Sequence, residues 1–134
     1  DRVRVAVATA EPGAWITGIG WDLGFLEECV REPGRLPTKE ELDAVAPDNP
    51  VFLADLSYHA AWLNSAALER ADVDAARWPQ LVPVNADGEP IGILYEGVMQ
   101  AVSELLPAID AADRRLAAEN ALTGLTALGI TSIT

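Results

Sequence analysis

The chain has 134 residues, of which half are apolar and 22% are charged, a balance typical of a globular protein. This length suits one domain with a core of its own. The net charge of -12 argues against nucleic acid and anionic membrane surfaces as partners. No apolar run approaches the roughly 20 residues of a membrane-spanning helix. Cys29 is the only cysteine, so no internal disulfide can form and the cytoplasm is the expected compartment.

The first third of the chain predicts short elements separated by glycine and proline. Residues 3–8 alternate like a strand, but an Ala-rich helix ending at residues 12–13 fits nearly as well, and periodicity does not decide between them. Residues 15–21 predict a strand containing two glycines, and residues 23–31 predict a short helix. Because the chain starts without Met or a signal-peptide pattern, we expect it to begin inside a longer gene product.

Polar caps then mark the next elements. Thr38 and Glu41 have the spacing of a capping box, which predicts a helix that buries Leu42 and Val45. The short apolar run at residues 51–54 is bounded by polar residues and predicts a strand buried on both faces.

The middle of the chain predicts a helix and a hairpin. Ser57 is expected to cap a helix over residues 58–71. Residues 85–88 (Asn-Ala-Asp-Gly) have good turn chemistry and lie between the apolar stretches 82–84 and 91–95, which predicts a hairpin.

The last third predicts two helices and a strand. An apolar face over residues 98–106 predicts one helix, and Asp110 opens a longer one that Gly129 caps. Residues 130–133 then predict a strand that completes the αβ half of a parallel βαβ unit. Because this strand runs into the last residue, we expect the chain to stop in mid-element. Its unpaired edge predicts a homodimer.

Residue types alone reveal no active site. One histidine and one cysteine exclude a Cys/His zinc cluster, and the sequence has neither an HxH nor an HExxH pattern. It has no Gly-x-Ser-x-Gly nucleophile elbow, and residues 18–20 (Gly-Ile-Gly) lack the third glycine of a dinucleotide-binding loop. Composition and periodicity therefore predict a mixed α and β (α+β) domain and no reaction.

Six short blocks, in order and at characteristic spacing, carry a resemblance to a known family. They are residues 15–22 (WITGIGWD), 37–38 with 42–47 (PT and LDAVAP), 50–53 (PVFL), 59–68 (HAAWLNSAAL), 92–96 (GILYE) and 128–132 (LGITS). Together they resemble the amidohydrolase superfamily, in particular its family 3 of metal-dependent hydrolases similar to N-substituted formamide deformylase.

The resemblance implies a mixed α/β segment of a distorted TIM barrel that carries divalent metal, expected to be zinc, at its strand ends. A metal-bound hydroxide would attack a C–N bond of a small-molecule substrate. None of the family's histidine ligands lies in this sequence, so we expect the isolated chain to hold no metal and to be inactive. Residues 1–126 correspond to an insertion region and residues 127–134 to the start of a barrel strand. The alternative is a non-enzymatic binding or oligomerisation module.

Four residues are candidates for substrate contact. His59 and Asn64 fall on the helix predicted over residues 58–71, where they either tie the helix to neighbouring backbone or face the pocket. The family block favours the pocket. Glu96 follows a strand and opens a helix, where an acid can simply stabilise the first turn, and this simpler role is the favoured one. Asp22 is a candidate for the pocket wall.

Overall fold

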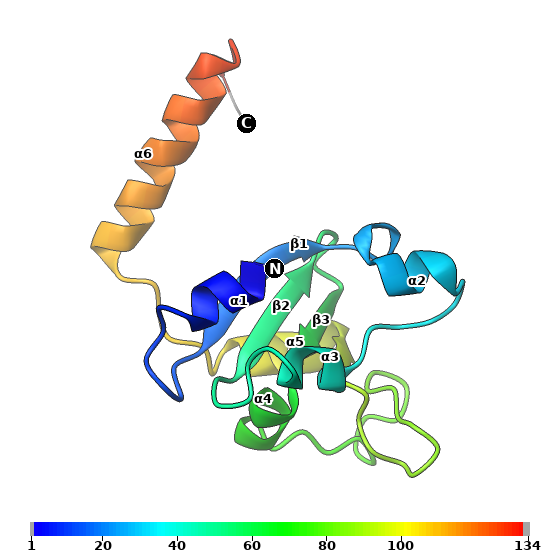
Figure 1. Cartoon of the computed structure of the whole chain (residues 1–134). Coiled ribbons are helices and arrows are strands. Elements are labelled where there is room, and N and C mark those ends of the chain that lie inside the picture. Colours follow the sequence, from blue (N-terminus) through cyan, green and yellow to red (C-terminus); the bar gives the residue numbers. More distant parts are fainter. Residues whose placement is uncertain (1, 133–134) are drawn as a thin grey trace.

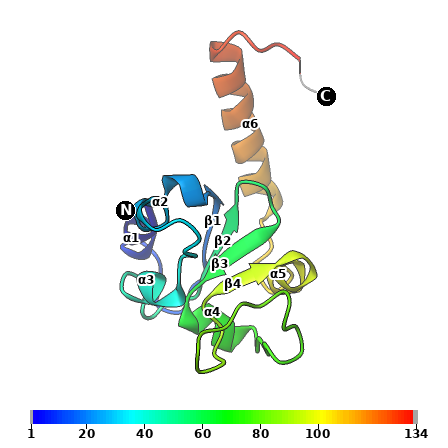
Figure 2. The ribbon, with the colours of Figure 1, turned by 90° about the vertical axis from the view of Figure 1, so that its right-hand side faces the viewer.

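Four strands form one mixed sheet in the computed structural model, which describes residues 2–132. In order across the sheet they are β1 (Ile16–Trp21), β2 (Val51–Asp55), β3 (Ala60–Leu63) and β4 (Ile93–Tyr95). β1 is parallel to β2, whereas β3 is antiparallel to both β2 and β4. The carboxyl ends of β1, β2 and β4 therefore lie at the same end of the sheet as the start of β3 (Figures 1 and 2).

Helices cover both faces of this sheet (Figure 2). On one side lie α1 (Arg2–Val7), α2 (Glu27–Arg31) and α3 (Lys39–Asp43), with the 3-10 turn η1 (Leu23–Phe25) leading from β1 to α2. On the other side lies α5 (Glu96–Ser103), while α4 (Ser65–Arg70) directly follows β3. The predicted mixed α and β class is confirmed.

Alternation along the strands divides the core into two clusters. Phe52, Ala54 and Leu63 belong to the cluster that contains the buried face of α5, whereas Val51 and Trp62 belong to the cluster beneath α1 and α3. Successive side chains of a strand point to opposite faces, so a central strand with apolar residues on both faces holds the two layers together. The prediction that residues 51–54 form a strand buried on both faces is confirmed.

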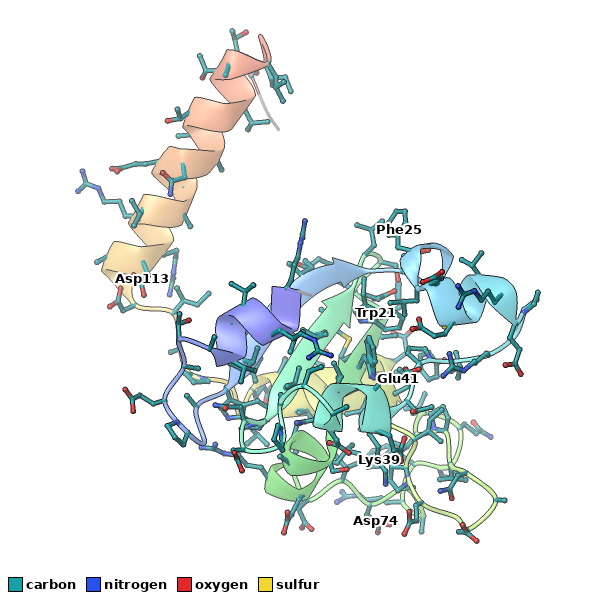
Figure 3. All side chains as sticks on the ribbon, viewed as in Figure 1. Trp21, Phe25, Lys39, Glu41, Asp74 and Asp113 are labelled. Atoms are coloured by element: carbon teal, nitrogen blue, oxygen red, sulfur yellow. The ribbon has the colours of Figure 1, made fainter. Side chains whose placement is uncertain are left out.

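Two tryptophans close the α1–α3 side of the core. Trp21 and Trp62 meet edge to face with ring centroids 6.1 Å apart. Their indole N–H groups donate to the carbonyls of Leu53 at 2.8 Å and Thr38 at 2.9 Å. Figure 3 shows Trp21 and Glu41 on this side of the sheet. The Glu41 carboxylate accepts from the Thr38 N–H at 2.9 Å, so the predicted capping box is confirmed.

Residues 3–7 of the undecided segment 3–8 are helical, and residue 8 lies in the turn that follows. Val3, Ala6, Val7 and Ala10 pack against the core, whereas Val5 is exposed. That spacing of three, four and seven residues places the packed side chains on one face of a helix, not of a strand. Packing against β1 thus decides what the local alternation could not.

The helix predicted over residues 58–71 is wrong in its first half. Residues 60–63 form β3, all four of them buried, and the helix begins only at Ser65 with Asn64 as its N-cap. Alanine, tryptophan and leucine are compatible with a helix, but pairing with β2 on one side and β4 on the other satisfies this backbone better. Ser57 therefore belongs to the turn between β2 and β3.

The helices and the hairpin predicted in the rest of the chain are largely confirmed, with one correction at the end. The turn at residues 85–88 closes a hairpin with a single bridge, Val84 to Pro90, while β4 takes β3 as its sheet partner. α6 (Ala111–Ala127) begins at the predicted N-cap and extends away from the sheet with no buried residue (Figures 1 and 2). Residues 130–132 form no strand, which corrects the predicted strand over residues 130–133; residue 133 lies outside the described part.

No helix within residues 2–132 is long and apolar enough to cross a membrane.

Candidate functional site

The sheet topology gathers three of the four candidate residues at one end. Asp22 follows β1, His59 precedes β3 and Glu96 follows β4, and these three positions share the end of the sheet where β1, β2 and β4 finish. Ligand sites of sheets with parallel strands lie characteristically beyond the carboxyl ends of those strands. Asp22 and Glu96, 74 positions apart in the sequence, thus lie at the same end of the sheet, beyond its two outer strands.

His59 and Glu96 form a direct pair. His59 Nδ1 lies 3.0 Å from Glu96 Oε1, and the two side chains are 69% and 60% exposed. A carboxylate can only accept hydrogen bonds, so Nδ1 must carry the hydrogen in this contact. The other ring nitrogen, Nε2, remains available for a second group.

The pair lines a shallow cavity of about 330 Å³. The other lining residues are Tyr58, Gly97, Met99, Gln100 and Ser103, mostly from α5. Tyr58 and Glu96 both have positive φ, at 60° and 49°, which is uncommon for residues other than glycine. Strained backbone of this kind tends to collect at functional sites.

Asp55 lies at the same end of the sheet, at the last position of β2. Burial by itself raises the pKa of its carboxyl. Hydrogen bonds from Ser57, Ala60 and His59 together lower the pKa by a larger amount, so that it lies below its usual value. Sequence reasoning missed this residue because Ser57 was assigned to a helix cap. The Asp-x-Ser spacing after a short apolar run is a turn signal that could have identified it.

Asp22 has a local role in the structure. Its carboxylate accepts from the Gly24 N–H at 2.7 Å and so caps η1. The side chain is exposed and does not line the cavity beside His59 and Glu96. It shares their end of the sheet but not their contacts.

Asn64 lies at the opposite end of the sheet, after β3, and is fully buried. Its Oδ1 accepts from the N–H groups of Val51 at 2.9 Å and Ala67 at 3.0 Å, and its Nδ2 donates to the carbonyls of Ala46 and Asn49, both at 2.9 Å. Every hydrogen-bonding group of this amide is engaged by backbone. The contacts support the interpretation that Asn64 ties its helix to neighbouring segments, and they separate it from the His59–Glu96 pair.

The part of the chain that the structure describes does not fit a metal centre. Within residues 2–132, no three or more His, Cys, Asp or Glu side chains are grouped so that they could hold a metal ion. Cys29 is 7% exposed, and its burial raises the pKa of its thiol. A divalent metal of the kind implied by the resemblance would need ligands from elsewhere.

Known proteins with sequences similar to this chain include the following two. N-substituted formamide deformylase from Arthrobacter pascens is 40% identical over 88 residues, which make up 63% of this chain and 15% of that protein. Protein LONG AFTER FAR-RED 3 from Arabidopsis thaliana is 31% identical over 134 residues, 98% of this chain and 22% of that protein.

Two solved structures are similar as well, both described as uncharacterized metal-dependent hydrolases. The one from Pyrococcus furiosus has 27% sequence identity and a TM-score of 0.52, covering 98% of this chain and 25% of its own. The one from Pyrococcus horikoshii OT3 has 28% identity and a TM-score of 0.51, covering 90% and 22%. This chain thus spans between 15% and 25% of the length of these relatives.

The family comparison covers the chain from end to end. The family model described as "Amidohydrolase family" matches residues 1–134. The six sequence blocks, the formamide deformylase relative and the two hydrolase structures agree with it. The chain belongs to the amidohydrolase family.

Proposed function

We propose that this chain is a segment of a larger metal-dependent hydrolase that cleaves a C–N bond of the amide or formamide type. Family membership and the two metal-dependent hydrolase neighbours support the class of enzyme. The bond type is supported by the 40% identity to a protein named N-substituted formamide deformylase. In this proposal the chain supplies part of the pocket wall, and its substrate is a small molecule.

The His59–Glu96 pair is the observation that carries the proposed role of this chain in the pocket wall. Both side chains are more than half exposed, so their contact adds little to stability. Glu96 is nevertheless held at a strained φ of 49° beside an open cavity. Interactions that contribute little to folding but are held in a strained conformation are typical of functional sites.

The pair has defined chemistry towards a substrate. With its hydrogen on Nδ1, a neutral His59 presents the Nε2 lone pair to a substrate N–H or O–H group, and a protonated His59 donates from Nε2 instead. Glu96 holds the ring in one orientation and in one tautomer. We propose that His59 and Glu96 orient the substrate, with Asp22 at the rim of the same sheet end and Asn64 supporting the scaffold.

The metal belongs to the rest of the proposed hydrolase. Because residues 2–132 offer no ligand cluster, no step of the reaction is assigned to a metal held by this chain. We propose zinc as the ion, a TIM barrel as the surrounding fold, residues 1–126 as its insertion region and residues 127–134 as the approach to a barrel strand. The isolated chain is then inactive.

Substitutions in the intact hydrolase test the proposed role of the pair. His59→Ala and Glu96→Gln should each lower kcat by about tenfold to a thousandfold, the range for a positioned hydrogen-bonding group, while metal content stays unchanged. Steady-state kinetics, elemental analysis and thermal unfolding are measured on each variant. Glu69→Gln is the matched control, because Glu69 is also an exposed helical acid but lies on α4, at the other end of the sheet.

The three measurements separate the possible roles. A folded, metal-loaded and slow enzyme supports substrate orientation. Normal turnover with a lowered melting temperature would show that His59 and Glu96 are structural. Loss of metal would show that the pair belongs to the metal centre, and an equal loss of turnover in Glu69→Gln would remove the specificity of the result.

A further inference from the structure

One carboxylate organises the turn that joins β2 to β3. Asp55 Oδ1 accepts hydrogen bonds from the N–H groups of His59 and Ala60, both at 3.0 Å. Its Oδ2 accepts one from the Ser57 hydroxyl at 2.6 Å, and its main-chain carbonyl accepts one from the Tyr58 N–H at 3.3 Å. Four groups of the connection from Ser57 to Ala60 thus bind to one residue.

We propose that Asp55 is the positioning residue of the His59–Glu96 pair. Its carboxylate holds the backbone from which the His59 ring reaches Glu96, so the pair forms only while that carboxylate is in place. The meaning of this role for catalysis rests on the function proposed above, whereas the positioning itself can be tested without any activity.

The backbone of His59 is held on both sides. Its N–H donates to Asp55 Oδ1 at 3.0 Å, with a longer contact of 3.4 Å to the Ser57 hydroxyl, which itself donates to Asp55. Its carbonyl accepts from the Glu96 N–H at 3.0 Å. The side-chain contact between Nδ1 and Glu96 Oε1 adds a third link. Two of these three links connect His59 to Glu96. The remaining link, to Asp55, therefore sets the direction from which the β2–β3 turn approaches Glu96.

Tyr58 shows why the turn needs this support. Its φ of 60° places an aromatic residue in the left-handed region, which costs energy in the absence of compensating contacts. Hydrogen bonds to an ionised acceptor are stronger than those to a neutral one, so the carboxylate of Asp55 is well suited to offset this strain. If Asp55 is truncated, we expect Tyr58 to relax, the following peptide to rotate, and the His59 ring to lose Glu96.

The test uses the fact that His59 is the only histidine of the chain. Nitrogen-15 NMR of the imidazole reports unambiguously which ring nitrogen carries the hydrogen at a pH where the ring is neutral. In the wild-type chain we expect the Nδ1–H form to dominate, and Glu96→Ala should abolish that preference. Asp55→Ala should abolish it as well, whereas Asp55→Asn, which keeps one oxygen acceptor for the two N–H groups, should restore much of it.

Asp43 provides the matched control. Its carboxylate accepts from the Ser65 N–H at 2.8 Å and from the Ser65 hydroxyl at 2.7 Å, so it makes comparable hydrogen bonds, but between α3 and the start of α4 at the other end of the sheet. Asp43→Ala should leave the His59 tautomer unchanged. If Asp55→Ala retains the Nδ1–H preference, or if Asp43→Ala loses it equally, Asp55 has no positioning role.

A second measurement needs no variant and decides the question even if Asp55→Ala does not fold. Scalar couplings through hydrogen bonds should connect the amide nitrogens of His59 and Ala60 to the carboxylate carbon of the Asp55 side chain in the wild-type chain. Their absence in a folded sample would overturn the proposal. Neither NMR result depends on turnover, so failure here leaves the hydrolase assignment untouched, and failure of the kinetic test leaves the positioning result standing.

Discussion

At the residue scale, Asn64 shows how one buried amide connects distant segments. A primary amide has two donor hydrogens and a double acceptor, and Asn64 uses them on the backbone of four residues from three neighbouring segments. A buried polar group is tolerated only when it is bonded in this way. Its place in the fold is therefore explained by stability, at the end of the sheet away from His59.

The Asn64 contacts lead to a stability prediction. Asn64→Ala leaves buried backbone groups without partners and removes the cap of α4, so the free energy of unfolding should fall by about 3 kcal/mol or more. Urea denaturation of the chain measures this loss. Asn85→Ala is the control, because the exposed Asn85 accepts from two backbone N–H groups in a surface turn and should cost about 1 kcal/mol or less. Equal losses in both variants would contradict the account.

Sequence reasoning could reach these residues but not their roles. His59, Asn64 and Glu96 stand out in the family blocks, yet the spacing of His59 and Asn64 was interpreted on a helix that does not form. On β3 and its flanks the two residues lie at opposite ends of a strand. Their separation depends on the long-range pairing of β3 with β2 and β4, which local patterns do not contain.

At the element scale, the helices with clear local signals were predicted well. The capping box at Thr38 and the Asp110 cap, which accepts from the Asp113 N–H at 2.7 Å, act within one turn of the chain. β3 was missed because its residues have no strong preference against a helix. The predicted strand after Gly129 is absent from residues 130–132, whereas the homodimer stays a prediction.

At Gly92 the segment before β4 comes very close to the end of β3 and to the start of α3. Its φ is 108°, and a Cβ built on it would lie 2.6 Å from the Leu63 carbonyl oxygen and 2.9 Å from the Lys39 nitrogen. Leu63 and Lys39 also hydrogen-bond to this segment through their backbone N–H groups. The position therefore requires glycine both for its conformation and for its space.

Replacement of this glycine gives a prediction with an internal control. Gly92→Ala should lower the free energy of unfolding by about 2 kcal/mol or more, because backbone atoms must move apart and the residue is strained. Gly124→Ala should instead raise helix stability by about 0.5–1 kcal/mol, because a Cβ at Gly124 in α6 meets nothing within 4 Å. Thermal and urea unfolding of the two variants compare them directly. A harmless Gly92→Ala would show that the close approach is not real.

At the scale of the whole molecule, the sheet brings His59, Glu96 and Asp55 to one end and leaves α6 without a buried residue. The family was predictable from six blocks because their order and spacing can be recognised in a single sequence. The convergence of His59, Glu96 and Asp55 at one end of the sheet was not predictable, because it follows from the order and direction of the strands. The family's metal chemistry has no counterpart in the groups that residues 2–132 bring together.

The central claim is that this chain contributes substrate-side groups to a hydrolase whose metal is held by other residues. Elemental analysis tests it most directly. The purified 134-residue chain is incubated with zinc, dialysed and measured for metal per chain. Because a protein zinc site needs three or four converging ligands, the account predicts far less than one equivalent. Close to one tightly bound zinc per chain would contradict it.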